Sequence, residues 1–132
     1  MVMPKPLPAG GFAVPLKASF LVLQPLPIIA VAHNNAAPRL TLFEDTVEFR
    51  VLSLQRRSYA EIEAVDAQQF IGTQNIILYW RKRLLGFSGN IGAEDQLIVL
   101  LAFFEEKQLS LTDRARGILV RAAKERVKSK GN

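Results

Sequence analysis

The stretch "RLTLFEDTVEFRVL", residues 39–52, decides the fold class that the sequence predicts. Apolar and polar residues alternate on both sides of a short polar break at residues 44–46. Such alternation is typical of strands with one buried face, and two of them around a polar turn predict a β-hairpin. We expect Thr41, Glu48 and Arg50 to lie on its solvated face. The expected core residues are Leu40, Leu42, Val47, Phe49 and Val51.

Three segments after this hairpin also have strand character, because apolar and aromatic residues recur in each. Gly72 marks a turn between the first and the second. The second and third can pair, which places the basic triplet Arg81-Lys82-Arg83 at the tip between them. The segments are "RRSYAEIEAVDAQQF" (56–70), "NIILYW" (75–80) and "RLLGFSG" (83–89).

Residues 93–107 predict a helix around eight consecutive apolar residues, 97–104. Acidic residues before this run and Lys107 after it suit the two ends of a helix dipole. A strand is the alternative for so apolar a run. Because the run is apolar on all sides, a helix here must be covered on both sides.

Residues 112–128 predict a second helix, with Thr112 as its N-cap. We expect its apolar stripe to cover the first helix and its basic side to face outward. Residues 114–130 hold seven basic residues and one acidic residue, so their net charge is +6, whereas the rest of the chain carries −1. Any electrostatic partner should therefore bind at this end. The stripe comprises Ala115, Ile118, Leu119, Ala122 and Val127.

The first 38 residues contain all seven prolines and no acidic residue. Proline fixes φ and removes a backbone donor, so we expect much of this head to be extended or irregular. An apolar run before Ala30-Val31-Ala32 resembles a secretory signal with its cleavage site, although Gln24 and two prolines interrupt it. The alternative is a loose arm followed by an edge strand at 27–34. A membrane-spanning helix would need a longer unbroken run, of about 20 residues.

Size and composition predict one globular domain, and the predicted strands and helices place it in the α+β class. The chain has 132 residues, of which about half are apolar, and this is enough for a core. We expect a small antiparallel sheet or a partly open barrel, capped by one helix and followed by a basic helix. The expected parts are an arm or signal at 1–32, a body at 33–110, and a basic helix and tail at 111–132. The absence of Cys excludes disulfides and thiolate chemistry.

This order of elements resembles a bacterial pleckstrin-homology-like (PH-like) domain. The resemblance covers about residues 38–107 and rests on "LTLFEDTVEFRV", "RRSYAEIEAVD", "NIILYW", "LLGFSGN" and the helix at 93–107. It implies a binding or assembly module without catalysis. Lipid-binding relatives in eukaryotes use a basic loop between the first two strands, whereas "FEDT" here is acidic, so that site does not carry over. The fold alone does not choose a ligand.

Two basic surfaces are candidate sites for an anion or an anionic lipid, because Arg binds phosphate through paired hydrogen bonds. The first surface combines the triplet with Arg56 and Arg57. The alternative interpretation is that the triplet is only a solvated turn. The other is the basic side of the second helix, which either binds an anionic membrane or is simply solvated. Ile98 and Phe103 are the candidate apolar interface. The candidate anion contacts are Arg56, Arg57, Arg81, Lys82, Arg83, Arg121, Lys124 and Lys128.

No catalytic, phosphate-loop or metal-binding motif occurs in the sequence, so we expect no enzyme activity and no cofactor. His33 is the lone histidine. Glu61, Glu63 and Asp66 form an acidic cluster that we expect to be solvated, with Glu61 and Glu63 on one strand face. An enzyme with an unrecognised site is the alternative, and loss of turnover in His33→Ala or Glu61→Ala would support it.

The first functional hypothesis is a non-catalytic binding or self-assembly module that acts through protein–protein contacts, including contacts between copies of this chain. The second is peripheral binding to anionic membrane lipid through the basic helix. We do not expect nucleic acid as a partner, because such a site needs exposed aromatic residues among the basic ones. Only Tyr79 and Trp80 adjoin the triplet, and one of the two should point into the core. The expected location is cytoplasmic or membrane-associated, or secreted if residues 1–32 are a signal.

Overall fold

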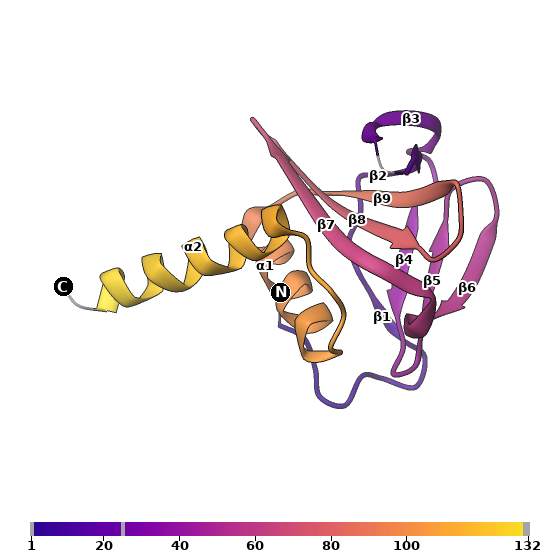
Figure 1. The fold of residues 1–132 in the computed structure, drawn as a ribbon. Coiled ribbons are helices and arrows are strands. Elements are labelled where there is room, and N and C mark those ends of the chain that lie inside the picture. The colour runs from indigo at the N-terminus through magenta and orange to yellow at the C-terminus, as the bar shows by residue number, and fades with distance from the viewer. Residues whose placement is uncertain (1, 25, 131–132) are drawn as a thin grey trace.

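The computed structural model describes residues 2–24 and 26–130 and contains two antiparallel β-sheets and two C-terminal helices (Figure 1). The elements are β1 (Phe12–Ala13), β2 (Ala18–Leu23), β3 (Leu26–Asn34), β4 (Arg39–Leu42), β5 (Thr46–Arg50), β6 (Leu54–Ser58), the 3₁₀ turn η1 (Tyr59–Glu61), β7 (Ile62–Phe70), β8 (Thr73–Trp80), β9 (Leu85–Ile91), α1 (Glu94–Glu106) and α2 (Asp113–Lys130). The strand orders are β1-β4-β5-β6 and β3-β2-β9-β8-β7. The two sheets do not close completely, so they form a partly open barrel, and α1 caps it. This arrangement confirms the predicted α+β class.

The predicted hairpin is confirmed as β4 and β5, and its five predicted core residues are buried. The prediction that its opposite face is solvated is wrong for Thr41 and for Glu48, which is only 9% exposed. Arg39 and Arg56 close over the Glu48 carboxylate at 3.0 and 3.2 Å. The long arginine side chains of the neighbouring strands therefore shield this acidic residue from water.

The N-terminal residues contribute three strands, so the expectation of a loose arm is wrong. β2 lies between β3 and β9 and pairs with β9 along its whole length. Proline does not prevent this, because Pro15 precedes β2 and Pro27 lies in β3, the edge strand predicted at 27–34; Pro25 lies outside the described residues. Ala30-Val31-Ala32 lies inside β3, so cleavage after it would take β2 out of the sheet.

The apolar run 97–104 forms a helix, not a strand, and α1 packs against β8, β9 and α2. The N-terminal segment lies beside the C-terminal end of α1. The Leu7 N–H donates a hydrogen bond to Glu44 Oε1 at 2.6 Å, and Lys107 Nζ donates to the Glu44 carbonyl at 2.6 Å. A helix that is apolar on all sides must be covered by other parts of the chain on several sides, and α1 is covered in this way. The fully buried side chains are Leu97, Leu100, Leu101 and Phe104.

α2 begins as predicted, because Thr112 Oγ1 accepts a hydrogen bond from the Ala115 N–H at 3.2 Å. Ala115 and Ile118 are buried against the body. The C-terminal part of α2 extends away from both sheets (yellow in Figure 1), and the side chains of residues 123–129 are exposed. The prediction that Val127 belongs to the docked stripe is therefore wrong. Neither helix of the described chain combines the length and the apolar character needed to cross a membrane.

Candidate functional site

The turn between β8 and β9 carries the basic triplet Arg81-Lys82-Arg83. Gln24, which follows β2, holds the backbone of this turn through hydrogen bonds. Gln24 Nε2 donates to the carbonyls of Trp80 at 3.2 Å and Arg83 at 3.0 Å. Gln24 Oε1 accepts from the Trp80 N–H at 2.9 Å. Lys82 adopts the left-handed turn conformation with φ of 55°. The triplet is thus held in place by a residue that, in the sequence, only interrupts an apolar run.

A groove of about 680 Å³ lies between β6 and this turn. Its size falls within the range of about 300–1,000 Å³ that is usual for ligand sites. Its lining contains apolar and basic side chains and one acidic side chain, Glu61, so the groove suits a ligand that combines an apolar and an anionic group. The apolar lining consists of Leu21, Phe49, Trp80, Leu84 and Leu85, and the basic lining of Arg57, Arg81, Lys82 and Arg83.

Arg57 is the least satisfied cation of this groove. Its guanidinium lies 4.6 Å from the ring centre of Trp80 and 5.2 Å from that of Phe49. Nη2 donates to Gln55 Oε1 at 2.6 Å, whereas Nη1 is buried and has no hydrogen-bond partner within the described part of the chain. Burial, and then the charge of Arg83, lower the pKa of Arg57. An anion in the groove would supply a counter-charge, and it would accept from Nη1 once the Arg57 side chain turns to expose this nitrogen.

The structure brings Arg57 and the triplet together but separates Arg56 from them, because successive residues of a strand face opposite sides. The Arg56 guanidinium lies 4.1 Å above the Phe43 ring and pairs with Glu48. The prediction that Arg56 and Arg57 share one patch is therefore wrong. Arg81 pairs with Glu63 at 2.6 Å. Among the described residues, the groove cations without an ion pair are Arg57, Lys82 and Arg83.

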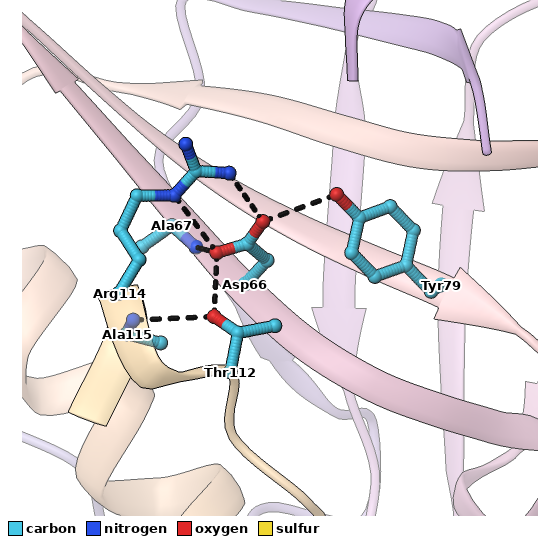
Figure 2. A network of polar contacts seen from close by, with 6 residues as sticks. All are labelled: Asp66, Ala67, Tyr79, Thr112, Arg114 and Ala115. Atoms are coloured by element: carbon cyan, nitrogen blue, oxygen red, sulfur yellow. Dashed lines mark hydrogen bonds and ion pairs between the residues drawn. The ribbon is translucent and has the colours of Figure 1, made fainter. Parts of the chain in front are cut away.

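A second polar site lies where α2 meets β7, around Asp66 (Figure 2). Its carboxylate accepts hydrogen bonds from Arg114 Nη2 at 2.6 Å, from the Thr112 hydroxyl at 2.6 Å and from the Tyr79 hydroxyl at 3.1 Å. The Ala67 N–H and Arg114 Nε also donate to it. The Asp66 side chain is only 4% exposed, so the prediction that it is solvated is wrong. We call Asp66, Thr112, Arg114 and Tyr79 the α2 latch.

The charges of the latch follow from its contacts. Burial raises the pKa of Asp66, but the hydrogen bonds from Arg114, Thr112 and Ala67 and the Arg114 charge outweigh burial, so the net pKa is below its usual value. The hydrogen bond to Asp66 raises the pKa of Arg114. Burial, and then the Asp66 charge, raise the pKa of Tyr79. The carboxylate is ionised and engaged by donors of its own chain, so this arrangement fixes α2 against β7.

The other acidic and histidine candidates are separate from one another. Glu61 lies in η1, where its carboxylate accepts from the Ser58 N–H at 3.1 Å, so the prediction that it shares a strand face with Glu63 is wrong. His33 is exposed on β3, with its ring 6.4 Å from that of Phe20. Across residues 2–24 and 26–130, no three His, Asp or Glu side chains converge in a way that could hold a metal ion.

The two residues of the predicted apolar interface, Ile98 and Phe103, are not exposed together. Phe103 is buried in the core, with its ring 6.0 Å from that of Tyr59, so its assignment to an exposed interface is wrong. Ile98 is half-buried against the same core. On α2, Arg121 donates to Gln69 Oε1 at 2.7 Å, and Lys124 and Lys128 are exposed.

No protein-family model matches the chain, and no curated protein matches it by sequence. The resemblance to PH-like domains therefore stays a prediction from the pattern of elements. The groove, the α2 latch and the exposed part of α2 are interpreted from their own geometry.

Proposed function

We propose that this chain is a non-catalytic binding module that receives an anionic group of a partner protein in the groove between β6 and the β8–β9 turn. The observation that supports this most directly is the buried Nη1 of Arg57, which lacks an acceptor within the described chain. A buried donor without a partner costs about 1–3 kcal/mol. A carboxylate or phosphate oxygen removes this cost once the Arg57 side chain turns Nη1 toward the groove, so binding is favoured beyond simple charge attraction.

The rest of the groove defines the ligand that fits best. Lys82 and Arg83 add two further cations without ion pairs in the described chain, and Gln24 holds their backbone in one conformation. A preorganised site loses less conformational entropy on binding. The exposed Leu84 and the partly exposed Leu21 and Leu85 can contact an aromatic or aliphatic group beside the anion. We therefore expect an acidic or phosphorylated side chain that has an apolar neighbour.

The experiment is a fluorescence titration. Trp80 is the only tryptophan, is 2% exposed and contacts the Arg57 guanidinium, so its emission should report on the groove. The probes are inorganic phosphate, phenyl phosphate and a short peptide of glutamate and phenylalanine. We expect phenyl phosphate and the peptide to bind at lower concentrations than inorganic phosphate, and salt to weaken all three.

Two neighbouring residues supply matched variants. Arg57→Met removes the groove cation, whereas Arg56→Met removes a cation on the opposite face of the same strand. We expect Arg57→Met to weaken phenyl phosphate binding at least tenfold, in line with the roughly 1.5–3 kcal/mol of a hydrogen bond to a charged group. Arg56→Met should bind as the wild type does. Equal effects of the two variants, or no binding of any probe, would contradict the proposal.

A second candidate function is peripheral binding to anionic membrane lipid. The observation that favours it is the exposure of α2 beyond Ala122. Residues 121–128 hold four basic residues and one acidic residue. Basic residues near an anionic leaflet each add about 1 kcal/mol of attraction. Vesicle flotation in a salt series tests this function, and flotation that does not depend on anionic lipid would contradict it.

A further inference from the structure

Two large apolar side chains stand at the tip of the β7–β8 hairpin. Phe70 is 55% exposed and Ile71 is fully exposed, at 106% of its reference area. Gly72 follows with φ of 78°, a left-handed conformation that lets the chain reverse directly after them. Water thus surrounds an aromatic and a β-branched side chain in adjacent positions, which is unfavourable for a protein that keeps this tip in solution.

The tip is attached to α2. Gln69 and Gln74, on the two strands just behind the tip, hydrogen-bond through their side-chain amides at 2.8 Å. Arg121 of α2 donates to Gln69 Oε1 at 2.7 Å. Further along β7, the Asp66–Arg114 ion pair fixes the start of α2. The tip is therefore connected to α2 through Gln69 and Arg121, and in Figure 1 the β7–β8 end points to the upper left while α2 runs to the left.

The exposed part of α2 is basic and leaves its charges unpaired. Within the described part of the chain, no carboxylate forms an ion pair with Lys124, Arg126 or Lys128. Val120 and Val127 are 48% and 70% exposed on the same helix. Residues 123–129 include no buried residue, so the sequence of this part of α2 is not explained by packing against the body.

We infer that the β7–β8 tip and the exposed half of α2 form one docking surface for an anionic lipid bilayer. Phe70 and Ile71 enter the interfacial region of the bilayer, while the basic residues of α2 contact the headgroups. Stable attachment of a peripheral protein usually needs two such signals, one apolar and one electrostatic. A fully exposed Ile71 and a half-exposed Phe70, connected to a helix with unpaired cations, suit an anionic bilayer, because its interfacial region receives apolar groups and its headgroups receive positive charge.

This inference rests on the second candidate function, because it names the apolar anchor that the basic helix lacks. The test is flotation of the full chain with vesicles of phosphatidylcholine alone and of phosphatidylcholine mixed with phosphatidylserine. We expect flotation only with the mixed vesicles, and loss of flotation at high salt. No flotation with either composition would overturn both the membrane function and this inference.

Variants test the contributions of the β7–β8 tip and of the basic part of α2 separately. Phe70→Ser/Ile71→Ser should lower the partition onto mixed vesicles more than tenfold. Leu52→Ser, which changes a 75% exposed apolar residue in the β5–β6 turn, should leave the partition unchanged. Lys124→Gln/Lys128→Gln should lower it by roughly fivefold per residue, and the exposed Lys17→Gln should have little effect. If the tip variant floats as the wild type does, the membrane function stands and the role of the tip is wrong.

Insertion can be observed directly with Ile71→Trp. The native Trp80 is buried, so a tryptophan at the tip supplies the signal that lipid can reach. Phospholipids brominated on their acyl chains should quench this tryptophan in mixed vesicles and should not quench it when phosphatidylserine is absent. Binding of this variant to mixed vesicles without quenching would show that the contact is electrostatic alone, and would overturn the inference.

Discussion

Arg114 Nη2 lies 2.6 Å from Asp66 Oδ2, and this ion pair joins the first turn of α2 to the middle of β7 (Figure 2). The two partners differ in exposure, because the Arg114 side chain is 50% exposed and the Asp66 side chain only 4%. Water can therefore solvate the guanidinium but hardly reaches the carboxylate. The stability of the buried charge depends on the donors that the protein itself supplies.

Replacement of Asp66 by alanine should destabilise the fold. The change leaves the hydroxyls of Thr112 and Tyr79 without their acceptor and Arg114 without its counter-ion. We expect the free energy of unfolding to fall by about 2–4 kcal/mol, measured by urea denaturation. Glu63→Ala is the matched control on the same strand, because its ion pair with Arg81 is exposed on both sides and should contribute less than about 1 kcal/mol. Equal losses in the two variants would contradict the role of the latch.

The latch should also make stability depend on pH. Hydrogen bonds to Asp66 hold its pKa below the ordinary value of 3.8, so the folded state binds fewer protons than the unfolded state in this range. The contribution is complete above the unfolded pKa and is lost as the pH falls toward the folded pKa. We therefore expect the free energy of unfolding to decrease from about pH 5 downward.

Two variants show which carboxylates cause this loss of stability at low pH. Asp66→Asn should flatten the dependence of the unfolding free energy on pH. Glu44, whose pKa is lowered chiefly by the hydrogen bond from the Leu7 N–H and then by Lys107, acts in the same direction. Glu44→Gln should remove a second, separate part of the slope. A wild-type slope in Asp66→Asn would mean that the latch does not couple folding to proton binding.

The predictable part of the fold is local in sequence. The alternation around residues 44–46 contains the period of the two strands that it forms, and the apolar run 97–104 has the charges of a helix at its two ends. The place of β2 could not be predicted in this way. It pairs with β9, for example Leu21 with Phe87, and the prolines around it resemble those of an irregular segment. No pattern within β2 indicates a partner so far along the chain.

For the candidate sites, too, only the features that are local in sequence could be predicted. Arg57 and the triplet are visible as charges in the sequence, but strand alternation alone could have separated Arg56 from Arg57. Asp66 and Glu63 look alike in sequence, and Asp66 differs only because Arg114, 48 residues later, lies beside it. The function of Gln24 as the anchor of the basic turn likewise depends on contacts with residues 56 and 59 positions away.

Arg57→Met should change stability little. The variant removes a partly desolvated charge whose Nη1 has no partner in the described chain, and this gain offsets the lost contact with the Trp80 ring. A cation–π contact contributes about 0.5–2 kcal/mol, so we expect the free energy of unfolding to stay within about 1 kcal/mol of the wild type. Urea denaturation followed by Trp80 fluorescence measures this. A loss as large as that of Asp66→Ala would make Arg57 a structural cation, and weaker anion binding in Arg57→Met would then not identify a ligand site.

Two glycines should respond in opposite directions to replacement by alanine. Gly117 lies inside α2, and a Cβ added there meets no atom within 4 Å, so Gly117→Ala should raise the free energy of unfolding by about 0.5–1 kcal/mol through helix propensity. Gly11 has φ of 86°, and its added Cβ would lie 2.5 Å from Thr41 Cγ2 and 2.8 Å from the Phe43 ring. Gly11→Ala should therefore lower it by more than about 1 kcal/mol. Urea denaturation of the two variants measures both changes, and destabilisation by Gly117→Ala would mean that α2 is not helical at this position in the folded chain.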